Sequence, residues 1–179
     1  MRPLPPILKK LARAQAAFFK AAEVIECEQW ATKPGANEWS VAEVVAHLIM
    51  VERAIVGAAD RVTQKVAQPV AFLKRMHLPL WLVEARVVKR KSPLALDPAL
   101  VGKKEEMLGG LRATHERTLA FLQETDKRDL RKYCWPHPFI GMLNLYEWFE
   151  MIASHQVRHT KQVVEISERL PKLEGISQN

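Results

Sequence analysis

Cysteine is scarce in this chain of 179 residues, which has only two, Cys27 and Cys134. Two cysteines in a chain of this length do not form the disulfide framework of small secreted proteins. We therefore expect two free thiols in a reducing compartment. Cys134 lies close to His137 in the sequence, but an ordinary loop cysteine is favoured over a catalytic thiol there.

The sequence also lacks a long hydrophobic run. No stretch approaches the ~18 consecutive apolar residues that a membrane-spanning helix needs. The first ten residues have no extended apolar region and no small-residue cleavage site of the kind found in signal peptides. These two absences lead us to expect a cytoplasmic protein.

Glycine is sparse, with 7 residues, and neither an internal repeat nor a strong strand-like alternation is present. Apolar residues make up 48% of the chain and charged residues 26%, which is ordinary for a globular protein. A chain of this length can bury roughly 70% of the surface of its unfolded form. We therefore expect a single domain over residues 1–179.

Periodicity predicts four long helices. Apolar residues recur at spacings of three and four, which places them on one face of a helix. The second helix has a clear beginning, because Ser40 and Glu43 form a capping box. The pattern predicts a loop over residues 133–143. The helices are expected at residues 4–30, 40–66, 99–124 and 144–170.

Four long helices with short breaks predict an all-α four-helix bundle. Residues 67–98 form a long, basic and amphipathic connection between the second and third helices, and Pro79 divides its apolar part into two short pieces. So long a connection indicates that the helices do not simply alternate in direction.

The net charge of +7 is concentrated in one segment. Residues 61–91 carry eight basic side chains against one acidic side chain, Glu84, which accounts for the whole excess. Nucleic-acid-binding proteins usually spread basic residues over a binding face, so the charge alone is weak evidence for that class. The basic residues are Arg61, Lys65, Lys74, Arg75, Arg86, Lys89, Arg90 and Lys91.

Three histidines are predicted to face the core of the bundle. His155 and His159 are four residues apart and continue the apolar face of the last helix. His47 occupies an equivalent inward position on the second helix. Each buried imidazole needs partners for both nitrogens, and an unmet polar group costs about 1–3 kcal/mol. A shared metal ion would explain all three, although hydrogen-bonded core histidines remain the alternative interpretation.

Two stretches of the sequence resemble the DinB-like superfamily of metal-dependent enzymes. They are residues 37–52, which contain Trp39, Ser40 and His47, and residues 137–162. The second stretch ends in a His-x-x-Arg-His-x-x-Gln pattern that runs from His155 to Gln162. The resemblance implies a bundle with up-down-down-up topology. It also implies a site for nickel, zinc, iron or a similar divalent ion, held by His47, His155 and His159.

Three further residues are candidates for lining the pocket or for hydrogen bonding to the metal ligands. His115 lies on the inner face of the third helix, as a fourth ligand or a supporting acid, although a core histidine is the simpler interpretation. His137 lies in the loop before the last helix, where it could line the mouth of the pocket. Arg158 lies between the two ligand histidines and points at a different angle. His77 is expected at the surface.

Three ligands leave coordination positions open, which is typical of a catalytic rather than a structural metal. We therefore expect an enzyme, a transferase or hydrolase, that activates a small thiol cofactor or water for attack on a small molecule. No catalytic residue beyond the metal ligands is indicated. The alternative is a non-catalytic, stress-related binding module. In that case residues 61–91 would contact nucleic acid or an anionic membrane. We also expect a homodimer.

Overall fold

The computed structural model describes residues 4–67, 77–85 and 100–171. Four long helices account for most of these residues: α1 (Leu4–Glu23), α2 (Val41–Thr63), α4 (Lys104–Glu124) and α5 (Leu145–Arg169). The shorter elements are η1 (Cys27–Gln29), α3 (Trp81–Glu84), η4 (Leu130–Lys132), β1 (Cys134–His137) and β2 (Gly141–Asn144). The predicted all-α four-helix bundle is confirmed.

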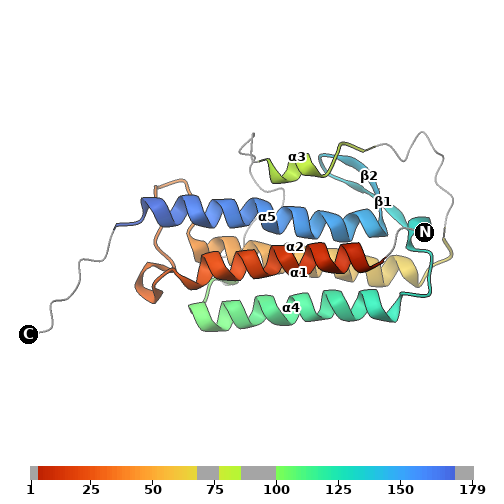
Figure 1. The fold of residues 1–179 in the computed structure, drawn as a ribbon, viewed down its shortest axis with the longest axis horizontal. Coiled ribbons are helices and arrows are strands. Elements are labelled where there is room, and N and C mark those ends of the chain that lie inside the picture. The colour runs from red at the N-terminus through yellow and green to blue at the C-terminus, as the bar shows by residue number, and fades with distance from the viewer. Residues whose placement is uncertain (1–3, 68–76, 86–99, 172–179) are drawn as a thin grey trace, which may run out of the picture.

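The directions of the helices follow the up-down-down-up order. In Figure 1, α1 and α5 run from right to left, whereas α2 and α4 run from left to right. Helix α1 packs along α5, and α2 packs along α4. The second and third long helices, α2 and α4, are therefore parallel, and the long connection between them, which contains the short α3, makes this possible.

Helix α2 ends at Thr63, three residues before the predicted end, and two other helices differ more from their predicted ranges. Helix α1 ends at Glu23 instead of continuing to residue 30, and the Lys104 ammonium donates to the carbonyls of Glu23 and Ile25 at 2.9 and 2.6 Å. Helix α4 begins at Lys104, and not at residue 99. Just before it, the Gly102 carbonyl accepts a hydrogen bond from the Trp30 indole at 3.2 Å. Contacts between the two segments therefore set both ends, which a local pattern cannot reveal.

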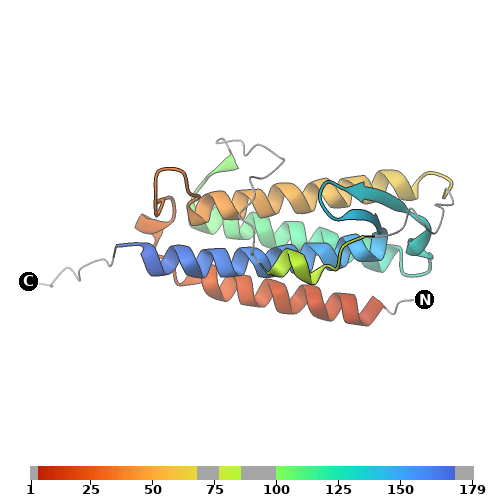
Figure 2. The same ribbon diagram turned by 90° about the horizontal axis from the view of Figure 1, so that it is seen from above.

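The prediction of a loop over residues 133–143 was wrong. Strands β1 and β2 form an antiparallel hairpin in which His137 pairs with Gly141. Gly141 has a φ angle of 104°, a conformation that favours glycine. The Leu78 amide donates to the Ile140 carbonyl at 2.8 Å, so a segment distant in sequence supports the hairpin. The hairpin lies beside the N-terminal end of α5 (Figures 1 and 2).

Helix α3 is attached to the side of α5 by polar contacts. The Ser154 hydroxyl donates to the Glu84 carboxylate at 2.7 Å, and Lys10 of α1 lies 3.2 Å from the same carboxylate. The Arg158 guanidinium donates to the Val83 carbonyl at 3.3 Å.

No helix among the described residues is long and apolar enough to cross a membrane.

Candidate metal centre

The last helix brings two of the predicted ligands to one face. Helix α5 begins with a capping box, in which Asn144 and Glu147 exchange side-chain and backbone hydrogen bonds. From this fixed start, Trp148, Ile152 and Val163 are buried along the inner face, and His155 and His159 continue that face. Two imidazoles one turn apart on the same face can bind the same metal ion.

The third histidine comes from the helix opposite. Helix α2 also begins with a capping box, formed by Ser40 and Glu43 as the sequence predicted. Val44, Val45 and Leu48 are buried around His47, which is itself only 5% exposed. The apolar packing therefore holds the His47 ring in the space between α2 and α5.

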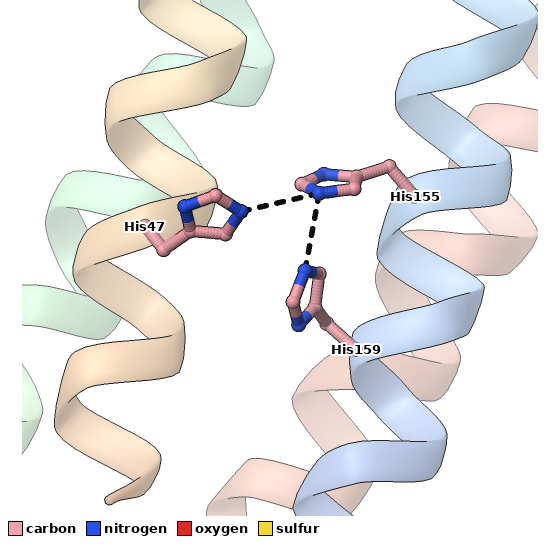
Figure 3. A group of neighbouring side chains, drawn as sticks. All are labelled: His47, His155 and His159. Atoms are coloured by element: carbon pink, nitrogen blue, oxygen red, sulfur yellow. Dashed lines mark hydrogen bonds between the residues drawn. The ribbon is translucent and has the colours of Figure 1, made fainter. Parts of the chain in front are cut away.

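The three rings converge through their Nε2 atoms (Figure 3). The Nε2 atom of His155 lies 3.2 Å from Nε2 of His47 and 3.1 Å from Nε2 of His159. One ligand nitrogen from each residue lies within 4.8 Å of the others. A tetrahedral ion with metal–nitrogen bonds of about 2.05 Å separates its nitrogens by about 3.3 Å. The two short separations therefore suit ligands of a single ion.

Hydrogen bonding alone satisfies this arrangement poorly. The Gln162 amide oxygen lies 2.9 Å from Nδ1 of His159, so Nδ1 carries the proton and Nε2 of His159 has a lone pair. A single Nε2 proton on His155 can be donated to only one of its two neighbours. Three nitrogens aimed at one point are better satisfied by a cation that accepts a lone pair from each.

The histidines are also in the protonation state that suits a bound cation. Burial lowers the pKa of His47 to about 4. Burial, followed by the charges of His47, Arg158 and His137, lowers the pKa of His155 to about 3. The pKa of His159 is also lowered well below its usual value, mainly by burial. All three rings are therefore neutral at pH 7, the form that binds a metal.

One side of the centre is closed and another is accessible. The Trp39 ring stacks on His159 at 6.4 Å and lies 5.0 Å from the His47 ring. His47 and His159 are buried, whereas His155 is partly exposed. His155 also lines a small cavity with residues of α2 and α5. Its other lining residues are Leu48, Val51, Glu52, Ile152 and Gln156.

His115 is buried but does not join the three histidines. It is 2% exposed, and its Nδ1 lies 3.5 Å from the Glu52 carboxylate. The Thr118 hydroxyl donates to the same carboxylate at 2.5 Å. Within the described residues, the group able to share an ion contains His47, His155 and His159 alone. His115 therefore belongs to a separate buried polar cluster with Glu52.

The other two candidates lie near the centre. The charges of Arg158 and His137 both contribute to the lowered pKa of His155, which places them within electrostatic range of it. His137 lies at the end of β1, with its ring 5.3 Å from the Trp148 ring. Arg158 is held between α5 and α3 by the Val83 carbonyl. His77 is partly buried, 3.3 Å from the Glu147 carboxylate, and does not lie fully at the surface.

Sequence reasoning missed the residues around the site. The Glu52 carboxylate is 4% exposed, yet it was not included in the inward face of its helix. Gln156 is also buried, and its side-chain oxygen has no hydrogen-bond partner among the described residues. Trp39 and Gln162 were noted as features of the motif without a role. One signal could have identified both residues. Glu52 and Gln156 each directly follow a residue of a predicted inward face, Val51 and His155.

Both cysteines are free thiols, as predicted. The Cys134 thiol is directed to the Arg131 carbonyl at 3.4 Å. Of the eight basic residues in 61–91, only Arg61 and Lys65 are described. The remaining six lie outside the described residues.

Comparison with known proteins adds independent evidence. YuaE from Bacillus subtilis (strain 168), an uncharacterized protein, is 28% identical over 143 residues, which cover 78% of this chain and 84% of YuaE. YfiT from Bacillus subtilis, described as a probable metal-dependent hydrolase with an unusual four-helix bundle topology, aligns with a TM-score of 0.64 at 18% identity. That alignment covers 92% of this chain and 86% of YfiT.

The four-helix bundle protein TT2238 aligns with a TM-score of 0.57 at 19% identity, over 90% of this chain and 98% of TT2238. At these identities the two structures support the fold alone. The sequence pattern of the DinB superfamily matches residues 10–163, which include both capping boxes and all three histidines. With this match over most of its length, the chain belongs to the DinB superfamily.

Proposed function

We propose that this protein is a metal-dependent enzyme that activates water, or a small thiol in its place, for attack on a small electrophilic molecule. The observation that carries the proposal is the convergence of three neutral imidazoles, with Nε2 separations of 3.1 and 3.2 Å, from two helices. His47, His155 and His159 would hold one divalent ion. Neutral imidazole suits zinc, nickel and iron alike, so the donor set leaves the element open.

A divalent ion with three imidazole ligands lowers the pKa of water at its open position to about 7, or polarises a carbonyl group. Structural zinc is usually closed by four protein ligands, whereas this group contains three. Two neighbouring residues would support the ligands. Gln162 orients the His159 ring, and the Trp39 ring covers the side formed by His47 and His159.

Two features indicate where a substrate would enter. His155 is the partly exposed member of the three, so the accessible side of the centre lies next to it. The Arg158 guanidinium lies within electrostatic range of both His155 and His159. A cation at this position attracts an anionic group of a substrate or of a thiol cofactor.

Water is the nucleophile we favour. The similarity to YfiT, described as a probable metal-dependent hydrolase, supports hydrolysis, although the similarity itself is one of fold. A thiol-dependent transfer uses the same centre and differs in one measurable respect, which is the need for added thiol.

The test is turnover by protein loaded separately with zinc, nickel and iron(II). Each form is offered a panel of esters, amides and small electrophiles, with and without added thiol, beside His155→Ala as the control. We expect turnover only with bound metal, lost in the variant. Turnover without thiol identifies a hydrolase, and turnover that requires thiol identifies a transferase. Equal rates in the wild type and His155→Ala would contradict the proposal.

A further inference from the structure

His137 is held in one defined protonation pattern by the hairpin. It ends β1, and its Nδ1 atom accepts a hydrogen bond from the Phe139 amide at 3.1 Å. A backbone amide only donates, so Nδ1 must carry a lone pair. In the neutral ring the proton therefore lies on Nε2, which makes Nε2 a hydrogen-bond donor.

The ring of His137 lies beside the face of α5 that carries the metal ligands. It packs against the Trp148 ring at 5.3 Å and an interplanar angle of 41°. Trp148 precedes His155 by seven residues, which is two helical turns, so the two residues share a face. The group of nitrogens able to share an ion does not include His137. His137 is thus a neighbour of the centre and not a ligand.

The Nε2 donor of His137 has no hydrogen-bond partner among the residues that the structure describes, although the ring is only partly exposed. A fixed donor beside an open metal site, with no acceptor of its own, is the arrangement found where enzymes stabilise an anion.

We propose that His137 donates a hydrogen bond from Nε2 to an anionic group, a carboxylate or an oxyanion, bound at the open side of the three-histidine centre. This inference rests on the proposed metal-dependent function and assigns it a substrate-contacting residue. Arg158, within electrostatic range of His155, adds positive charge to the same region and favours the same class of ligand.

The rival interpretation is that His137 only stabilises the turn of the hairpin, through Nδ1 and the Phe139 amide. Two amide side chains separate the two roles. Asparagine places its oxygen near the position of Nδ1, so His137→Asn keeps the acceptor for Phe139, while its shorter amide has no donor at the position of Nε2. Glutamine is longer and places its NH₂ group near the position of Nε2, so His137→Gln keeps the donor and loses the acceptor.

The test uses protein loaded with cobalt(II), whose visible spectrum reports the ligands of the ion. Azide is the probe anion, and its dissociation constant is measured for the wild type and both variants. A hydrogen bond to a charged partner corresponds to about a tenfold change or more in affinity. We expect azide to bind about tenfold more weakly to His137→Asn and within about threefold of wild type to His137→Gln. Cobalt affinity and helical content should be unchanged in both variants.

Three results would overturn the inference. Azide binding unchanged in His137→Asn would mean that Nε2 contacts no anion. Equal weakening in both variants would mean that the turn, and not the donor, matters. Failure of the wild type to bind cobalt would refute the proposed function and the inference together, whereas the first two results would leave the metal centre intact.

Discussion

The hydrogen bond between Gln162 and His159 gives the sharpest test of how the protein prepares its ligands. The Gln162 oxygen accepts from Nδ1 of His159 at 2.9 Å, which leaves Nε2 of a buried ring free to bind. Replacing Gln162 by Leu removes the acceptor and keeps a side chain of similar size. Loss of such a supporting contact typically lowers metal affinity 10- to 100-fold, which is about 1.4–2.8 kcal/mol.

The assay is competition for zinc between metal-free protein and a chromophoric chelator at pH 7.5. The matched control is Glu168→Gln, an exposed position on the same helix, which should leave the affinity unchanged. Gln162→Glu keeps an acceptor oxygen and should bind zinc at least as tightly as the wild type. A zinc affinity for Gln162→Leu within twofold of the control would refute the reasoning that Gln162 orients His159.

Three further predictions concern the stability of the metal-free protein in urea. Burial lowers the pKa of His47 to about 4, so the unfolded chain takes up its proton near pH 6.5 and the folded chain only near pH 4. Stability is then full above pH 6.5 and falls as the pH drops, with roughly 3 kcal/mol of the loss by pH 4 due to His47 and the rest to His155 and His159. His47→Gln should reduce the loss by the His47 share; equal pH profiles would contradict this. Ser40→Ala removes the hydroxyl that caps α2 and should cost about 1 kcal/mol, with no change expected at the exposed control Glu168→Gln. Glu52→Ala removes the buried acceptor of the Thr118 hydroxyl and leaves a small cavity beside His115, and should cost about 1–3 kcal/mol; an unchanged free energy of unfolding would contradict a stabilising role for this carboxylate.

The long helices and the inward histidines could be predicted from the sequence because both depend on local periodicity. The spacing of His155 and His159 within an apolar stripe fixes their shared face once the segment is helical. The capping box at Ser40 is also a local signal, and the structure shows it in full. The approach of His47 to these two histidines depends on how α2 packs against α5. The sequence indicates it only indirectly, through the cost of burying three imidazoles without partners.

The hairpin could not be predicted in the same way. Its strands have four residues each and one contains Pro136, so the alternation is too short to detect. A two-stranded hairpin is marginal alone. Here it is supported by Leu78, which bonds to the Ile140 carbonyl from far away in the sequence. Its formation depends on tertiary contacts that a local pattern does not contain.

The buried carboxylate of Glu52 was missed for a related reason. A glutamate at the edge of an apolar stripe is usually solvated. Its partner Thr118 lies 66 residues later, on α4, and becomes visible only when α2 and α4 are packed together. The general lesson from this residue is that polar positions next to a predicted core face should be examined as candidate members of it.

The central claim is that His47, His155 and His159 bind one divalent ion, and metal analysis tests it most directly. Purified wild type is compared with alanine variants of each histidine, and His115→Gln serves as a control histidine outside the group. The account predicts about one zinc, nickel or iron ion per chain in the wild type and the control. It predicts loss of the ion in the three variants, with the helical signal retained. A wild type that takes up none of these ions, or alanine variants that keep them, would contradict it.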